Sequence, residues 1–282
     1  MKTVVVTGAS TGIGEATARV LIRRGMRVFG SVRKQADGAR LARELGDQFV
    51  PLIFDVTDEA AVTAAAGAVG AALNGETLAG LVNNAGIAVP GPLLHLPIAD
   101  FRKQLEVNLT GQLIATQAFA ALLGADHGRR GAPGRIVMMS SIGGRNASPF
   151  MGAYATSKFG LEGFSESLRR ELMVHGIDVI IIAPGAIATP IWDKADALDP
   201  AAFAHTAYAP AMTLAKEWIA NGRKGLPPET IGETVYTALT ARKPKFRYTV
   251  TPAPLQFFMM RRLPKRTVDR IIAKRLGWPP RR

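Results

Sequence analysis

Short apolar strands alternate with helix-length segments along most of the 282-residue chain, and this alternation constrains the fold more than any other feature. The first strands fall at 3–7, 28–32 and 49–54, and segments with helical periodicity separate them. The pattern continues with helices near 58–73, 98–123 and 152–174 and with strands at 81–86, 135–140 and 178–183. Strands that are apolar on both faces and separated by helices predict a doubly wound α/β fold with a parallel sheet.

After the sixth strand the alternation weakens. Residues 190–226 are amphipathic and irregular, and we interpret them as a lid over the substrate, with a plain connecting excursion as the alternative. A helix near 228–241 and a last strand at 246–250 follow. A chain of this length predicts a single domain over 1–252, to which residues 253–282 add a basic C-terminal extension.

The first strand runs into a glycine-rich loop, Thr7 to Gly14, and a helix follows at once. Glycines allow a tight turn and a close backbone approach to a pyrophosphate, whose charge is favoured by the free N–H groups of a helix N-terminus. Glycine-rich turns also precede helices for purely structural reasons. On the first strand of a βαβ unit, however, this loop indicates the dinucleotide site of a Rossmann fold.

The end of the second strand distinguishes the two nicotinamide dinucleotides. A carboxylate there would bind the ribose 2′-hydroxyl of NAD, whereas an arginine suits the 2′-phosphate of NADP. No acid stands at or next to Val32, and Arg33 and Lys34 follow it. We therefore predict NADP as the cofactor, with Arg33 on the 2′-phosphate and NAD as the alternative. The competing interpretation is that both cations only solvate a loop.

A second polar group follows the strand at 135–140. Ser141 comes directly after this strand, and Tyr154 and Lys158 stand four residues apart on a predicted helix, so that they share one helical face. A hydride that leaves an alcohol carbon requires removal of the hydroxyl proton, and a tyrosine with a pKa near ~10 becomes a better base when a nearby ammonium lowers that value. We expect Lys158 to lower the pKa of Tyr154 and Ser141 to donate to the substrate oxygen.

With these motifs in order, the sequence resembles the short-chain dehydrogenase/reductase family over roughly residues 3–190. Asn108, Ser141, Tyr154 and Lys158 match the catalytic tetrad of that family. The resemblance implies that Tyr154 is the general acid/base in alcohol–carbonyl interconversion by hydride transfer, and that Asn108 holds a water linking Lys158 to solvent. A helix bend is the alternative role for Asn108.

The resemblance also implies a cofactor site assembled from the ends of several strands. Its members are Gly8, Ser10, Thr11, Gly12, Ile13, Gly14, Arg33, Asp55, Val56, Asn84, Ala85, Gly86, Tyr154, Lys158, Pro184, Gly185, Ile187 and Thr189. Asp55 has a competing interpretation as a turn or cap residue. The family resemblance further implies a homodimer or homotetramer.

The stretch from 134 to 168 is especially similar to the branch that includes 17β-hydroxysteroid and retinol dehydrogenases. That branch implies a small lipophilic alcohol or carbonyl as the substrate. The predicted substrate contacts are apolar or aromatic, as in most ligand pockets: Val89, Phe150, Met151 and Trp192, with Ile87, Pro90, Ile191 and Met212 near them.

The formal net charge of +13 is concentrated near the C-terminus, where nine Lys and Arg between Arg261 and Arg282 stand against a single acid, Asp269. Apolar residues such as Phe257, Phe258 and Trp278 are interleaved with these cations. The pattern suits peripheral docking on an anionic membrane surface. The alternative is that the apolar side chains close the substrate pocket or a subunit contact while the cations are solvated. No apolar run approaches the roughly 20 residues that a membrane span requires.

Other function classes find little support in the sequence. The chain has no cysteine, its four histidines lack ligand spacing, and its first apolar run is too short for a signal-peptide core, so we expect no metal site and a cytoplasmic location. The basic charge comes without a helix-turn-helix, zinc or RNA-recognition signature, and we therefore expect no nucleic-acid partner. A non-catalytic NADP(H)-sensing protein on the same fold is the alternative function, and the intact catalytic residues argue against it.

Overall fold

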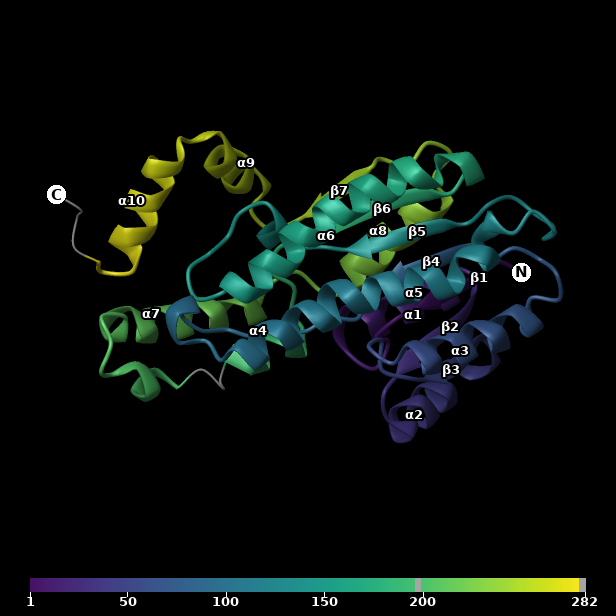
Figure 1. Cartoon of the computed structure of the whole chain (residues 1–282), viewed down its shortest axis with the longest axis horizontal. Coiled ribbons are helices and arrows are strands. Elements are labelled where there is room, and N and C mark those ends of the chain that lie inside the picture. The colour runs from purple at the N-terminus through teal and green to yellow at the C-terminus, as the bar shows by residue number, and fades with distance from the viewer. Residues whose placement is uncertain (196–198, 279–282) are drawn as a thin grey trace.

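The computed structural model describes residues 1–195 and 199–278, and in this part of the chain seven strands form one parallel sheet in the order β3-β2-β1-β4-β5-β6-β7 (Figure 1). The strands are β1 (Thr3–Val6), β2 (Arg27–Val32), β3 (Phe49–Ile53), β4 (Gly80–Asn83), β5 (Arg135–Met139), β6 (Asp178–Pro184) and β7 (Arg247–Val250). Every neighbouring pair is parallel. The strand order reverses between β1 and β4, which creates the crevice in which such folds bind ligands. The predicted doubly wound sheet is confirmed.

Helices cover both faces of the sheet. Their bounds are α1 (Gly12–Arg23), α2 (Gln35–Leu45), α3 (Glu59–Ala72), α4 (Ile98–Leu105), α5 (Gly111–Ala120), α6 (Gly152–Glu171), α7 (Ala209–Ala220), α8 (Glu229–Thr240), α9 (Pro254–Arg262) and α10 (Lys265–Arg275). The apolar sides of α1, α2 and α8 pack on one face of the sheet, and those of α3, α5 and α6 on the other. Two apolar cores therefore enclose the sheet, as expected from strands without a polar face.

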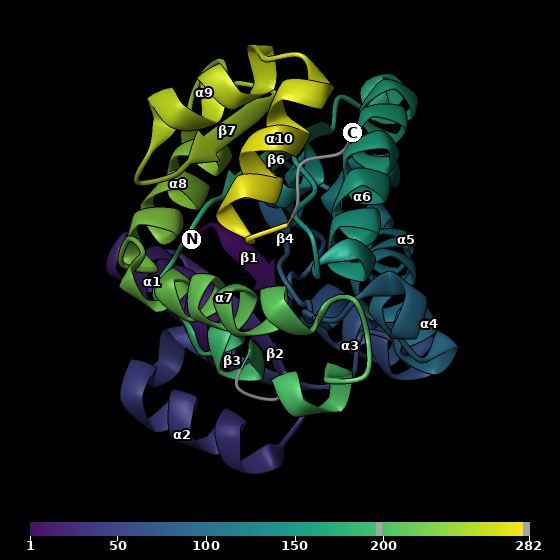
Figure 2. The ribbon, with the colours of Figure 1, turned by 90° about the vertical axis from the view of Figure 1, so that its left-hand side faces the viewer.

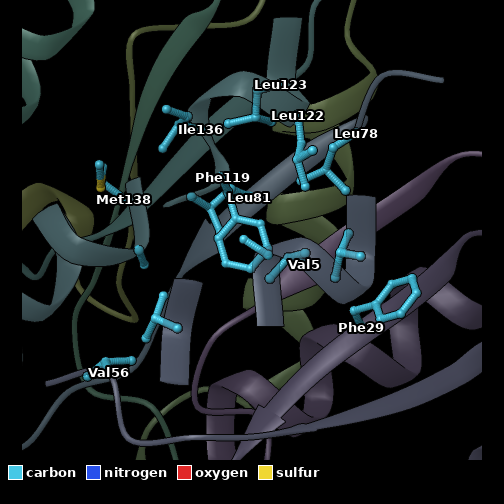
Figure 3. Packing of buried hydrophobic residues seen from close by; sticks show 14 of the residues in the cluster. Val5, Phe29, Val56, Leu78, Leu81, Phe119, Leu122, Leu123, Ile136 and Met138 are labelled. Carbon is cyan, nitrogen blue, oxygen red and sulfur yellow. The ribbon is translucent and has the colours of Figure 1, made fainter. Parts of the chain in front are cut away.

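The core under α5 shows how the sheet is held. Val5, Leu81 and Ile136 project from three neighbouring strands, and Figure 3 shows them gathered with Phe119 of α5. None of these four side chains is exposed to solvent. Burial of a large apolar side chain contributes about 1.5–3 kcal/mol, so this layer fixes the strands whose ends carry the site.

The long helix predicted near 98–123 is interrupted. After α4, a π-helical turn spans Glu106–Thr110 before α5 begins, and a second π-helical turn, Ala121–Ala125, closes the segment where Gly124 adopts a φ of 115°. Wide turns of this kind occur frequently at functional sites. Here the first one contains Asn108, which is fully buried.

The predicted lid is more regular than its sequence suggests. It consists of the 3₁₀ turns Pro190–Ala195, Pro200–Phe203 and Asn221–Lys224 and of the helix α7. Residues 196–198 of this lid and 279–282 of the extension lie outside the described residues.

The extension beyond β7 forms α9 and α10. Together with α7 these two helices lie at one end of the sheet (Figure 1), and seen from that end α7 lies on the opposite side from α9 and α10 (Figure 2). Within the described ranges, no helix combines the length and the hydropathy that crossing a bilayer would take.

Candidate active site

A cavity of about 1200 Å³ lies at the ends of the strands, between the glycine loop and the lid. Its walls include residues that follow each of the seven strands, together with parts of the lid, α9 and α10. All of the predicted cofactor residues line it. Of the other predicted site residues, Ser141, Phe150, Met151 and Trp192 also line the cavity, whereas Asn108 and Val89 do not.

The glycine loop after β1 has the shape that a bound pyrophosphate needs. Gly8 adopts a φ of 66° and Gly12 a φ of 58°, which side chains rarely tolerate. A Cβ at Gly14 would lie 2.1 Å from the Gly8 carbonyl oxygen, so the first turn of α1 can approach the loop only without a side chain there. The backbone at the start of α1 is thus open to the cavity and fits an anionic dinucleotide.

Side chains from β2 and β4 hold this loop in place. The Ser31 hydroxyl accepts a hydrogen bond from the Gly8 amide at 2.9 Å. The Asn84 side-chain amide donates to the carbonyl oxygens of Thr7 (2.9 Å) and Gly8 (3.1 Å). Arg40 of α2, which sequence reasoning missed, donates to the Ser10 carbonyl at 2.9 Å. The loop is therefore fixed before any ligand binds.

Arg33 stands at the cofactor end of the cavity. Its side chain is 76% exposed, and its guanidinium lies 3.9 Å from an Asp55 carboxylate oxygen. Asp55 also accepts hydrogen bonds from the Thr57 amide (3.1 Å) and the Thr57 hydroxyl (2.9 Å). The turn role considered for Asp55 is thus present, and Arg33 has donors left for a phosphate.

The catalytic candidates converge where β5 meets α6. The Ser141 hydroxyl is hydrogen-bonded with Tyr154 and accepts from the Gly143 amide at 3.0 Å. The Lys158 ammonium donates to the Met139 carbonyl oxygen at 2.7 Å, and its Nζ lies 5.8 Å from the centroid of the Tyr154 ring. The shared helical face predicted for Tyr154 and Lys158 is confirmed.

The electrostatics of this group correct one expectation. Burial raises the pKa of Tyr154, and the hydrogen bond with Ser141 lowers it only in part. The expected lowering by Lys158 is not found, because the ammonium is directed at the Met139 carbonyl. Burial also lowers the pKa of Lys158 to about 8, against the attraction of Glu162.

Three amide side chains bind the segment that follows β4. Gln104 accepts from the Val89 amide (2.8 Å) and donates to the Ile87 carbonyl (2.9 Å). Asn108 accepts from the Ile87 amide at 2.8 Å, and Gln112 donates to the Ala85 carbonyl at 2.6 Å. This ladder positions the cavity wall in the way a neighbouring strand would. The four-residue spacing of the three amides was a signal in the sequence that pointed to them.

Asn108 makes one further contact. Its amide nitrogen donates to the Ile87 carbonyl at 3.0 Å and to the Ser157 hydroxyl at 3.1 Å. Asn108 therefore joins the post-β4 segment to the helix that carries Tyr154 and Lys158.

Behind Lys158 lies a charged cluster that sequence reasoning also missed. The Glu162 carboxylate accepts from the Ser140 hydroxyl (2.8 Å), from Arg145 Nε (2.9 Å) and from Arg247 Nε (3.1 Å). The side chains of Glu162 and Arg247 are only 11% and 9% exposed. Burial lowers the pKa of Arg247, and its contact with Glu162 opposes that effect. Since Arg247 belongs to β7, this cluster ties the last strand to the catalytic helix.

The wall opposite the cofactor loop is apolar. Phe150 adopts a φ of 63°, and its ring makes edge-on contacts with Tyr208 of the lid (5.9 Å) and Trp278 of the extension (6.0 Å). Such a backbone conformation is rare for a bulky residue and costs about 1–3 kcal/mol. Trp192 also lines the cavity, where its indole nitrogen donates to the Ile187 carbonyl at 2.6 Å.

Two predicted pocket residues lie elsewhere. Val89 does not line the cavity, because its backbone amide is bound to Gln104 on the amide ladder. Met212 is fully buried in the small core under the lid.

The extension contributes to the cavity wall. Phe257, Met260, Ile272 and Leu276 line the cavity, and Trp278 contacts Phe150. These four side chains fit the interpretation that the extension packs over the pocket, whereas Phe258 is 53% exposed and does not line the cavity. The sequence showed their amphipathic pattern but gave no sign of which surface they would face.

Residues 2–199 match the sequence model of the family described as short chain dehydrogenase. The chain belongs to the short-chain dehydrogenase/reductase family. It is therefore an oxidoreductase on a Rossmann fold.

Relatives in this family carry several names. The chain is 37% identical over 278 residues to an NADPH-dependent 3-dehydrocapnine reductase of Ornithobacterium rhinotracheale, a match that covers 98% of each chain. It is 40% identical over 195 residues to retinol dehydrogenase 16 of Mus musculus, with 69% of this chain and 59% of that protein covered.

Solved structures of short-chain dehydrogenases share the fold. One from Burkholderia phymatum in complex with NAD aligns with a TM-score of 0.77 and 24% identity, covering 100% of this chain and 96% of the other. One from Streptomyces avermitilis aligns with a TM-score of 0.75 and 24% identity, over 98% and 95% of the two chains.

Proposed function

We propose that this protein is an NADPH-preferring reductase of a lipophilic ketone or aldehyde, with Tyr154 as the proton donor. One observation carries the proposal. The hydrogen-bonded group of Ser141 and Tyr154, with Lys158 behind it, lies where the cofactor loop and the apolar wall border the same cavity. The polar cofactor side and the apolar side of the cavity thus meet where Tyr154 can donate a proton.

The cofactor preference rests on Arg33 and on the absence of an acidic residue at position 32, the end of β2. An exposed guanidinium without a neighbouring acid at position 32 suits a 2′-phosphate. The name of the Ornithobacterium relative, which specifies NADPH, supports this choice. NAD remains the alternative, as bound in the Burkholderia structure. When bound, the nicotinamide supplies the hydride that the protein itself cannot provide.

The proton chemistry favours the reducing direction. A raised pKa keeps Tyr154 protonated at neutral pH, so the phenol can donate to the oxygen of a carbonyl substrate. Ser141 holds the same oxygen as negative charge develops on it. Lys158, whose pKa is about 8, carries an ammonium at neutral pH, and its Nζ lies 5.8 Å from the centroid of the Tyr154 ring.

The substrate class follows from the apolar wall. Phe150, Met151, Trp192 and Phe257 make most of that side apolar, while Asn221, Gln256 and Arg275 are polar residues that also line the cavity. The names of the relatives, 3-dehydrocapnine reductase and retinol dehydrogenase, supply two starting points for a substrate panel.

The proposal extends to the surroundings of the enzyme. We infer a cytoplasmic homodimer or homotetramer, as the family resemblance implies, with peripheral contact to a membrane through the extension. Light scattering on the full chain tests the assembly.

The decisive experiment replaces Tyr154 by Phe, which keeps the ring and deletes the transferable proton. We expect turnover of a 3-oxo or retinoid substrate to fall about 10²–10⁴-fold while the Kd for NADPH stays within about twofold. Thr156→Ala, at an exposed position of the same helix that does not line the cavity, serves as the control variant. Near-native turnover by Tyr154→Phe would overturn the proposal.

A further inference from the structure

The helix α9 presents two different apolar faces. One face carries Phe257 and Met260, which line the cavity, together with Gln256. The opposite face carries Leu255, Phe258 and Met259, whose exposed fractions are 69%, 53% and 57%. Residues 255, 258, 259 and 262 follow the spacing of a single helical stripe. We call this stripe, which ends in Arg262, the outer face of α9.

Exposed cations lie on α9 and along α10, and one of them contacts the outer face directly. Arg262 lies over the Phe258 ring at 4.6 Å. Six further cations on α9 and α10 are exposed: Arg261, Lys265, Arg266, Arg270, Lys274 and Arg275. None of these seven side chains forms an ion pair with a carboxylate in the ranges 1–195 and 199–278. Arg275 lines the cavity and Arg261 lies over the Phe257 ring, and the charge of the other five cations is available to an external anion.

We propose that the outer face of α9 docks on an anionic lipid bilayer. Three adjacent apolar side chains suit the acyl region just below the headgroups, and the flanking guanidinium and ammonium groups suit phosphate headgroups. A protein partner would need an acidic surface with an apolar centre. An anionic bilayer combines the two by its nature, since charged headgroups lie directly above the acyl chains. The charge complementarity favours the bilayer.

Docking in this orientation places the cavity next to the membrane. α9 is a single helix of nine residues, so its cavity face and its outer face are separated only by the width of the helix. A lipophilic substrate could then pass between α9 and the lid without crossing bulk water. This part of the inference rests on the proposed catalytic function, whereas binding of the outer face to the bilayer specifies the membrane contact proposed above and does not depend on catalysis.

The test measures co-sedimentation of the full-length protein with vesicles. Vesicles of phosphatidylglycerol and phosphatidylcholine are compared with vesicles of phosphatidylcholine alone at low salt. The triple variant Leu255→Ser, Phe258→Ser, Met259→Ser removes the apolar stripe and leaves every cavity-lining residue in place. We expect its partitioning into anionic vesicles to fall about tenfold or more, since both apolar insertion and headgroup attraction are needed.

A matched control uses exposed apolar side chains elsewhere. Met173 and Val174 are 64% and 78% exposed at the end of α6, so Met173→Ser with Val174→Ser should leave partitioning unchanged. Arg262→Gln with Arg266→Gln should weaken binding to anionic vesicles and remove most of its salt dependence.

Three results would overturn the docking proposal. The first is that the native protein does not sediment with anionic vesicles, and the second is that the native protein and the triple variant sediment equally. The third is that the native protein binds no lipid and forms a dimer that the triple variant loses. Turnover of a water-dispersed substrate is measured in parallel. If the native enzyme showed no turnover of that substrate, the proposed function would be refuted. The sedimentation result would still decide whether the outer face docks on a bilayer.

Discussion

The two walls of the cavity are built on different principles. The wall made by the ends of β1, β2 and β4 is held by directed hydrogen bonds, such as Ser31 to Gly8 and Asn84 to Thr7. The wall made by the lid and the extension is held by apolar and aromatic packing, with Phe150 between Tyr208 and Trp278. Directed bonds require particular residue types at particular positions, whereas packing requires only apolar volume.

This difference separates what the two walls can recognise. A wall with fixed geometry suits one invariant ligand, the dinucleotide, because each hydrogen-bonding group of the wall is held in one position. A packed wall accepts many apolar shapes at similar cost, so relatives with the same cofactor loop can act on different substrates. Substitutions in one wall should therefore change one ligand and leave the other unaffected.

The largest effect should come from the cofactor wall. Arg33→Ser removes an exposed guanidinium without disturbing a core, and loss of a charge-assisted bond to phosphate should weaken NADPH binding about 10–100-fold. The Kd for NADH should stay within about twofold, because its ribose has no 2′-phosphate. Fluorescence titration of both nucleotides measures the two values.

Arg43→Ser is the control, since Arg43 is an exposed arginine on α2 outside the cavity. Equal weakening of NADH and NADPH by Arg33→Ser would show that Arg33 does not read the phosphate. A change in KM for the lipophilic substrate would break the separation between the walls.

The second prediction concerns the Glu162 cluster, which ties β7 to the catalytic helix through Arg247. The attraction of Glu162 raises the pKa of Lys158, so Glu162→Gln should move that pKa below about 8. Less of Lys158 is then protonated at pH 7.5. Arg145→Gln removes a cation that offsets Glu162, so it should move the pKa of Lys158 upward instead. The double variant should lie between them.

NMR titration of ¹⁵N-labelled lysine side chains, together with the pH profile of kcat/KM, distinguishes an electrostatic effect of the cluster on Lys158 from a purely structural role. Removing the buried Glu162 carboxylate should destabilise the fold by about 3–5 kcal/mol, and removing the partly exposed Arg145 should destabilise it less, so stability should fall in both single variants. Only an electrostatic role moves the pKa of Lys158 in opposite directions. Shifts of the same sign would refute it.

The same division explains how much could be predicted from the sequence. The sheet, the glycine loop and the Tyr154–Lys158 pair follow from local patterns, because β-branched runs, glycine spacing and a four-residue helical repeat act over short distances. Gly14 is an example: its role depends on Gly8, six residues away. The cofactor wall was therefore readable in detail.

Contacts between distant parts of the chain were not readable. Arg247 reaches Glu162 across 85 residues, and no local pattern marks either side chain as a partner. The left-handed backbone at Phe150 and its contact with Trp278 depend on how the lid and the extension pack. The direction of the Tyr154 shift also required structure, since burial, rather than Lys158, dominates it.

The smallest effect should come from the packed wall. Trp278→Ala removes the edge-on contact with Phe150, which is worth about 0.5–1.5 kcal/mol beyond the area buried. The corresponding change is about 2–10-fold, and we expect it as a rise in KM for long apolar carbonyl substrates with little change in kcat. Trp278→Phe keeps an aromatic ring at that position and should restore most of the loss. A short polar carbonyl compound, which does not reach Phe150, should show no change with either variant. The Kd for NADPH should also stay constant, since neither Phe150 nor Trp278 belongs to the cofactor loop. If Trp278→Ala instead weakened NADPH binding as much as it raised KM, the two walls would form one cooperative unit, and the separation drawn from their different construction would be wrong.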